Sequence, residues 1–389
     1  MKKIIIVFIL LSNLGWSQNK KFTGKIVDAE TLQPVEFVNI FFEDGINANS
    51  TGSISNEIGE FSFSTITSQV TFSHINYESL SLTLNEKFNE IALKPKSYIL
   101  EEIVISKTLP RDYLKKVIST NSNKIEKNTL FKTYCREIVK INNDYSKFSD
   151  ALVDYYVKKG NGKSNIILTE HRALERPKID TTDNFKFDNI NSAFTLKDYV
   201  KNAYNFDKLE KIVKDKNYEF VRKIKKEANG DEYEYVEIIP NIDSDKMLNK
   251  GYVIIDQKTK NILEFKIYTA ESHLKNAKLV NIMIAKIRLN YSLDWSKFNL
   301  INNQYILTYN KTEAGIYVKM GDKVNDNFNF SSDLFVYEYK NDVQIPENGY
   351  KKRTIFEAGT KYKQEFWKLY NAFPLTASEQ KFINSIIKN

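Results

Sequence analysis

Apolar and polar residues alternate along much of the chain, which is the pattern of β-strands with one buried face. Up to residue 106 the alternating runs are short and are separated by turn-forming residues. In the turn Asn56-Glu57-Ile58-Gly59, the glycine should supply a positive φ. The spacing predicts a compact antiparallel β-sandwich over 18–106. Its expected strands cover 22–27, 35–42, 60–63, 70–73 and 80–84.

The periodicity becomes helical after residue 106. A linker helix within 107–128 is predicted by Pro110 followed by apolar residues at helical spacing, namely Tyr113, Leu114, Val117 and Ile118. Capping signals at 195–198 and 376–379 predict two further helices. Each of these helices should lay one apolar stripe on a sheet.

Residues 129–389 are expected to form that sheet. Asn229-Gly230, a strong hairpin signal, should join strands over 218–226 and 232–239, and a polar turn should join 251–256 to 262–268. Every second residue from Met283 to Leu293 is apolar, which predicts one long half-buried strand, and 305–309 and 316–320 repeat the pattern. The expected fold is an all-β sandwich of Ig-like type, followed by an α+β domain with a long antiparallel sheet.

The first seventeen residues have the features of a secretory signal peptide. Lys2 and Lys3 precede an apolar run over 4–11, and Gly15-Trp16-Ser17 ends the segment with small residues at alternate positions. The apolar run is shorter than the roughly 20 residues of a membrane-spanning helix. We therefore expect an exported protein with no transmembrane segment in the mature chain, in the periplasm or on the periplasmic face of the outer membrane.

Cleavage is predicted between Ser17 and Gln18, without a lipid anchor, because the segment lacks the cysteine that a bacterial lipoprotein carries at its cleavage site. Mass spectrometry of protein from the cell envelope should show a mature terminus at Gln18. An intact Met1 or a lipid-modified residue would contradict this prediction.

The net charge of +8 does not indicate a nucleic-acid partner. Only seven of the 57 basic residues are arginine, and the lysines are interspersed with acidic residues and asparagines, with no basic stripe. Base readout and bidentate phosphate contacts favour arginine. A solvated, lysine-rich surface is the simpler interpretation, and no nucleic-acid binding is expected.

Catalytic motifs are scarce. Cys135 is the only cysteine and lies in a strand-like segment, so we expect a buried, inert thiol. His74, His171 and His273 lack the close His-x-x-Glu pairing of a zinc exopeptidase, and the chain has neither a Gly-x-Ser-x-Gly motif nor a phosphate-binding loop. No metal, no cofactor and no enzymatic activity are expected. The alternative is a periplasmic hydrolase, either a peptidase or a glycosidase.

The N-terminal sandwich resembles the carboxypeptidase-D regulatory-like domain, a transthyretin-like β-sandwich frequent in Gram-negative envelope proteins. The resemblance rests on four segments, at 24–28, 33–40, 51–61 and 72–77. Asn56 stands where the family usually has Asp, and Asn76 where it usually has Gly, and both substitutions are compatible with turns. The resemblance implies a noncatalytic accessory domain.

The second domain is similar, over 251–256 and 262–265, to the curved half-barrel of periplasmic lipoprotein carriers. Its sheet could be fully covered by helices, or it could leave a hollow for an acyl chain. In the second case one apolar surface should be formed by Leu263, Phe265, Ile287, Leu289, Tyr305, Leu307 and Tyr309.

The favoured function is that of a noncatalytic binding or interaction protein of the cell envelope. The sandwich would be an accessory domain, and the second domain would carry the surface for a ligand or client. An envelope protein or a lipid or acyl ligand is the expected partner, and an acyl-chain or lipoprotein carrier is a further alternative.

Overall fold

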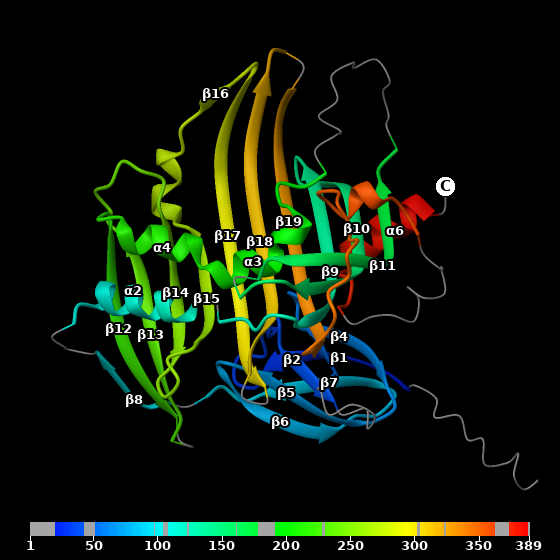
Figure 1. Ribbon diagram of the computed structural model, residues 1–389, viewed down its shortest axis with the longest axis vertical. Coiled ribbons are helices and arrows are strands. Elements are labelled where there is room, and N and C mark those ends of the chain that lie inside the picture. The colour runs from blue at the N-terminus through cyan, green and yellow to red at the C-terminus, as the bar shows by residue number, and fades with distance from the viewer. Residues whose placement is uncertain are drawn as a thin grey trace, which may run out of the picture. The chain divides into compact units, whose positions relative to one another are not determined.

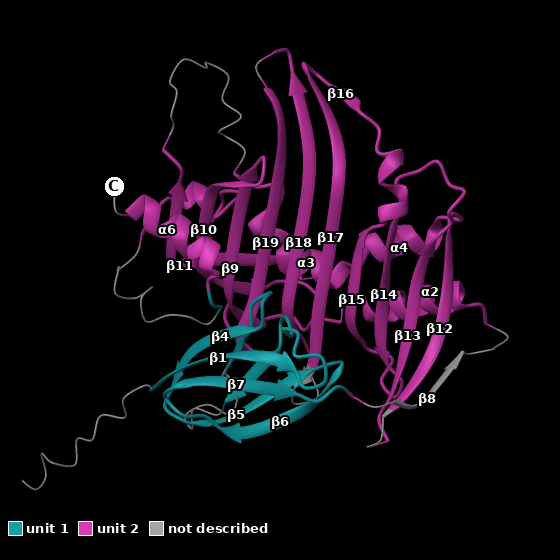
Figure 2. Ribbon diagram, turned by 180° about the vertical axis from the view of Figure 1, so that it is seen from behind, with its two compact units in different colours: residues 1–95, 365–374 teal, residues 96–364, 375–389 magenta. Residues whose placement is uncertain are grey.

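The structure is a computed structural model, and it divides into two compact units (Figure 2): residues 1–95 with 365–374, and residues 96–364 with 375–389. The predicted signal peptide and Asn229 of the predicted turn lie outside the described residues. The described residues are 20–42, 51–96, 98–103, 108–122, 124–160, 162–177, 191–227, 230–301, 304–322, 324–361 and 373–387.

The first unit is the predicted β-sandwich, but it is not antiparallel throughout, because the strands at 20–28 and 88–93 pair in parallel. One sheet has the order β4-β1-β7 and consists of β1 (Lys20–Asp28), β4 (Glu60–Thr65) and β7 (Phe88–Leu93). The other has the order β3-β2-β5-β6 and consists of β2 (Asn39–Phe42), β3 (Thr51–Ile54), β5 (Gln69–His74) and β6 (Tyr77–Thr83). Apolar side chains from both sheets form one core, including Phe22, Ile26, Ile40, Phe61, Phe63, Phe72 and Ile91.

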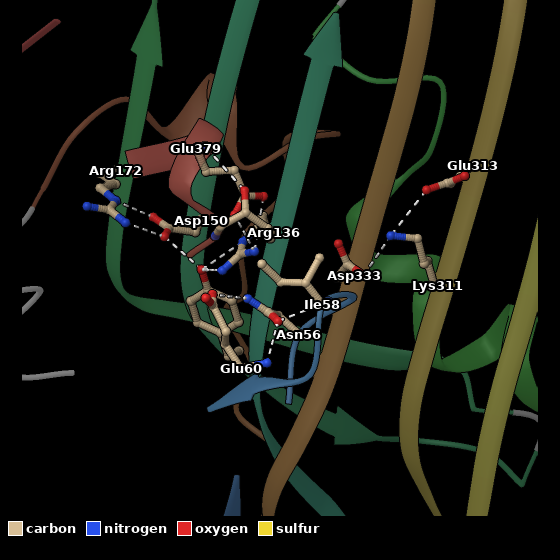
Figure 3. Close-up of polar contacts among 12 residues, drawn as sticks. Asn56, Ile58, Glu60, Arg136, Asp150, Arg172, Lys311, Glu313, Asp333 and Glu379 are labelled. Carbon is tan, nitrogen blue, oxygen red and sulfur yellow. Dashed lines mark hydrogen bonds and ion pairs between the residues drawn. The ribbon is translucent and has the colours of Figure 1, made fainter. Parts of the chain in front are cut away.

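Two local features of this unit follow from backbone conformation. The strand predicted over 35–42 begins only at Asn39, because Phe37 adopts a left-handed φ of 53° and interrupts the extended chain. Gly59 has the predicted positive φ of 75°, and a Cβ there would lie 2.4 Å from the carbonyl oxygen of Ile26. In the same turn the Asn56 Oδ1 accepts hydrogen bonds from the backbone N–H groups of Ile58 and Glu60 (Figure 3), so asparagine supports this turn.

The second unit is built on a 12-stranded sheet in which all pairs are antiparallel (Figure 1). The order is β11-β10-β9-β19-β18-β17-β15-β14-β13-β12-β8, and β16 pairs with β17. The strands are β8 (Tyr98–Ile103), β9 (Leu130–Ile141), β10 (Asp144–Val157), β11 (Ser164–Glu175), β12 (Tyr218–Glu227), β13 (Glu232–Pro240), β14 (Asn249–Asp256), β15 (Ile262–Thr269), β16 (Val280–Ile282), β17 (Ala285–Ile301), β18 (Gln304–Met320) and β19 (Val324–Lys340).

Helices pack on both faces of this sheet. The main core joins Leu114 of α2, Val200 of α3 and Leu209 of α4 to one face of the sheet. Cys135 of β9 belongs to this core. Helix α6 packs against Ile138, which is three residues after Cys135 in the same strand and therefore points to the other face. The helical elements are α2 (Pro110–Asn121), η2 (Leu196–Asp198), α3 (Tyr199–Asn205), α4 (Asp207–Lys214), η3 (Glu271–Asn276), η4 (Phe356–Ala358) and α6 (Ala377–Ile387).

The capping box predicted at 376–379 is present at the start of α6. The backbone N–H of Thr376 donates to Glu379 Oε2, and the backbone N–H of Glu379 donates to Thr376 Oγ1. No helix of the described chain is both long and apolar enough to cross a membrane.

The long strands β17 and β18 differ from the expected regular alternation. β18 is one strand of 17 residues, where the sequence suggested two separate runs. Register shifts lie between Leu289 and Tyr291 and between Lys297 and Phe298. The first shift leaves Asn290 as an extra residue in β17, so the apolar residues from 283 to 293 do not share one face.

Candidate functional site

Three of the seven residues predicted to line a hollow lie in the main core. Phe265, Tyr305 and Leu307 are buried there. The ring of Tyr204, on α3, meets that of Tyr305 edge-on at 5.9 Å, and the ring of Phe206 meets that of Phe265 at 5.7 Å. Aromatic side chains therefore fill the space above these residues.

Register shifts displace two more of the seven. Tyr309 is buried on the opposite face from Leu307, where its hydroxyl donates to Asp333 Oδ1 at 2.6 Å, because Thr308 is the extra residue of a bulge. Leu263 is likewise an extra residue in β15, with no residue of β14 opposite it. Ile262 therefore lies in the main core where Leu263 was expected.

The last two of the seven lie near the free end of β17. Ile287 packs against a separate small cluster, and Leu289 is 42% exposed. The structure therefore does not bring the seven residues to one surface.

A row of buried charged residues crosses the other face of the sheet. Strand register places five residues directly opposite one another on successive strands, with alternating sign (Figure 3): Lys311, Asp333, Arg136, Asp150 and Arg172. We call this set the charge ladder. No sequence pattern indicates the charge ladder, because the register of distant strands sets its order.

Each member of the charge ladder has a charged partner. Arg172 donates to both oxygens of Asp150, at 2.7 and 2.8 Å, and Asp150 also accepts a hydrogen bond from the Tyr134 hydroxyl. Burial lowers the pKa of Arg136, but the Glu379 carboxylate, 3.1 Å away, and the neighbouring Tyr134, Asp333 and Asp150 together raise it above its ordinary value. Buried charges in such pairs stabilise a fold only while both partners are present. The charge ladder is thus a structural network.

The opposite face of β9 holds a buried carboxyl group and the sole cysteine. Burial raises the pKa of Glu137 to about 7, although the Tyr199 hydroxyl and the backbone N–H of Ile355 donate to its oxygens at 2.7 and 2.9 Å. Burial also raises the pKa of Cys135 to about 12, which keeps its thiol protonated at neutral pH. Cys135 is buried, as predicted.

The three histidines lie in β5, β11 and η3 and make local contacts. His74 Nδ1 accepts from the backbone N–H of Asn76, His171 Nδ1 lies 2.9 Å from the carbonyl oxygen of Gly359, and His273 is buried against Asn241. Within the described ranges, no three His, Cys, Asp or Glu side chains are arranged to hold a metal ion.

The most prominent surface feature of the second unit is an exposed apolar turn between β16 and β17. We call it the apolar tip and define it by Leu279, Val280, Ile282, Met283 and Ile284, which are 47, 49, 50, 96 and 69% exposed. Sequence reasoning missed it by assigning Met283 to a half-buried strand. The available signal was the loss of alternation in Leu-Val-Asn-Ile-Met-Ile, without a nearby acidic residue.

A comparison with protein families identifies the N-terminal part of the chain. Residues 22–105 match the family model described as CarboxypepD_reg-like domain. The chain contains a CarboxypepD_reg-like domain. The matched residues of the CarboxypepD_reg-like domain include all the strands of the sandwich from β2 to β7, most of β1, and also β8, which pairs with β12 in the second unit.

Solved structures show only slight similarity to the chain. A DUF1329 family protein from Desulfovibrio piger is 10% identical, with a TM-score of 0.28, and the match covers 62% of this chain and 96% of that one. A LolA superfamily protein from Nitrosomonas europaea is 11% identical, with a TM-score of 0.21, covering 60% and 95%. A lipovitellin structure is 8% identical, with a TM-score of 0.28, covering 65% and 29%. Similarities at these TM-scores do not indicate a ligand. No curated protein matches the chain.

Proposed function

We propose that the protein is an exported, noncatalytic binding protein of the cell envelope. The CarboxypepD_reg-like domain would be its accessory module, and the second unit would carry the binding surface. The observation that carries the proposal is the apolar tip, where five neighbouring large apolar side chains within six residues are exposed to solvent. Contiguous exposed apolar patches on soluble proteins commonly mark interaction sites.

The polar groups of the second unit support a noncatalytic role. The charge ladder is engaged in buried ion pairs, and the Glu137 carboxyl and Cys135 thiol are buried on the face that α2, α3 and α4 cover. A hydrolase needs acidic, basic or nucleophilic groups that substrate can reach. The rings of Tyr204 and Phe206 fill the space above Tyr305 and Phe265, so these residues do not favour the alternative of an acyl-chain carrier.

Binding to envelope material should depend on the apolar tip. Replacing both tip residues at the turn, Met283→Asp with Ile284→Asp, should lower the fraction of purified protein retained on isolated envelopes about tenfold or more, because charged side chains cannot be buried in an apolar contact. Co-sedimentation measures this loss. The fold should survive, since both side chains are largely exposed.

Ile242→Asp is the matched control, because Ile242 is 64% exposed but lies outside the apolar tip. The control should bind as the unmodified protein does. Equal retention of the double variant and the unmodified protein would contradict the proposal. Stoichiometric zinc with chelator-sensitive hydrolysis by the purified protein would overturn its noncatalytic part.

A further inference from the structure

The apolar tip is surrounded by positive charge. Residues 272–293 contain no Asp or Glu, but they contain four basic residues: Lys275, Lys278, Lys286 and Arg288. All four are exposed, and none forms an ion pair with any residue in the described part of the chain. The neighbouring end of β18 adds the positive charge of Lys319, and Asp322 in the turn that follows adds one negative charge, so the excess remains positive.

The backbone separates apolar from polar side chains at the apolar tip. Ile282 lies opposite Ala285 and Val280 opposite Ile287, so these four side chains share one face of the two-stranded ribbon. Asn281 and Lys286 form the next pair and point to the other face. The ribbon is therefore amphipathic, with cations beside an apolar face.

The turn itself presents its most apolar residues outward. Met283 is 96% exposed and has a φ of 54°, a conformation that glycine or asparagine adopts more readily. Ile284, beside it, is 69% exposed. Figure 1 shows β16 and the start of β17 at one end of the long strands, beyond α3 and α4. Met283 and Ile284 are thus exposed in the turn that joins β16 to β17, at this end of the long strands.

We propose that the apolar tip docks on the surface of an anionic lipid bilayer. Met283, Ile284 and Ile282 would enter the headgroup–acyl boundary, and Lys278, Lys286 and Arg288 would contact lipid phosphates. This inference rests on the proposed function, since it names the partner of the same surface. Apolar side chains with flanking cations are the composition of interfacial membrane-binding segments, in which apolar burial and attraction to anionic lipids act together.

Charge complementarity and shape favour a bilayer over a protein partner. A bilayer accepts a convex apolar turn anywhere on its surface, whereas a protein needs a matching groove. The basic residues lie on both sides of the turn in the sequence, two before it and two after it, as contact with a continuous anionic surface requires.

Vesicle co-sedimentation tests the inference with lipids alone. The full mature chain should bind vesicles of phosphatidylcholine with about one third phosphatidylglycerol roughly tenfold or more tightly than pure phosphatidylcholine vesicles, and raising the salt should reduce this preference. Met283→Asp with Ile284→Asp should lower binding to the anionic vesicles about tenfold or more. Lys278→Glu with Lys286→Glu should abolish the preference for anionic lipid, and Ile242→Asp should change nothing.

A fluorescent probe at the turn gives a second measurement. Met283→Cys supplies an exposed thiol for an environment-sensitive dye, while Cys135 is buried and should not react. The emission should shift to the blue on addition of anionic vesicles and remain unchanged with neutral vesicles. A probe that stays in water while the protein binds vesicles would overturn the inference.

The vesicle and envelope experiments separate the two proposals. If the apolar tip is required on isolated envelopes but the protein ignores anionic vesicles, the partner is a protein, and the bilayer inference falls while the proposed function stands. If the double variant matches the unmodified protein on both materials, both proposals fall. Equal binding to neutral and anionic vesicles would overturn the role of the cations.

Discussion

Replacing Asp150 with alanine is expected to lower the free energy of unfolding by about 3–5 kcal/mol, the usual loss when one partner of a buried ion pair is removed. Asp150 is fully buried and accepts hydrogen bonds from Arg172 and Tyr134. Without the Asp150 carboxylate, the buried guanidinium groups of Arg172 and Arg136 would lose a neighbouring negative charge. Urea unfolding of the mature protein measures the change.

An exposed ion pair provides the control for Asp150. Glu78 and Lys94 lie 3.1 Å apart, and half or more of each side-chain surface is in water. Glu78→Ala should therefore lower stability by less than about 1 kcal/mol. If the two alanine variants were equally stable, the charge ladder would not be the structural network described above.

The stability of the second unit should depend on pH through Glu137. Its pKa in the folded protein is about 7, above the ordinary value of 4.5, so the folded state binds more protons than the unfolded state between these two values. Stability should fall as the pH rises through this window, by an amount on the order of 3 kcal/mol, and should level off above it. Unfolding in urea at pH 5 and at pH 8 gives the difference.

Glu137→Gln should remove this part of the pH dependence, because the amide does not titrate and still offers an acceptor to Tyr199. Other groups titrate in the same range, so the slope of the variant is compared with that of the unmodified protein. Glu78→Gln should leave the slope unchanged. A slope that persists in Glu137→Gln would show that another group is responsible.

Elements defined by neighbouring residues could be predicted from the sequence. The hairpin expected at 251–256 and 262–268 is present as Asn249–Asp256 and Ile262–Thr269, and the Gly59 turn has its positive φ. In each case, the turn residues and the flanking alternation lie within one short segment.

Features set by strand register could not be predicted. The bulge that turns Tyr309 away from Leu307 leaves the apolar alternation of the sequence intact, so the shared face expected there was wrong. The charge ladder requires Arg136 and Asp333 to meet across almost 200 residues of chain. The apolar tip was missed because exposure depends on what covers a strand, and apolar residues at alternate positions do not reveal it.

The meeting of β9 with β19 sets the order in which the chain can fold. The strands β9 to β11 come early in the second unit, yet in the described sheet they join the other strands only through β19, the last strand that the structure describes. Until β19 has been synthesised, β9 and β18 each have one unpaired edge that can bind other extended chains. Contacts between such distant segments also slow folding. The unfinished sheet is therefore exposed to aggregation until β19 has been synthesised, and its completion depends on this one late strand.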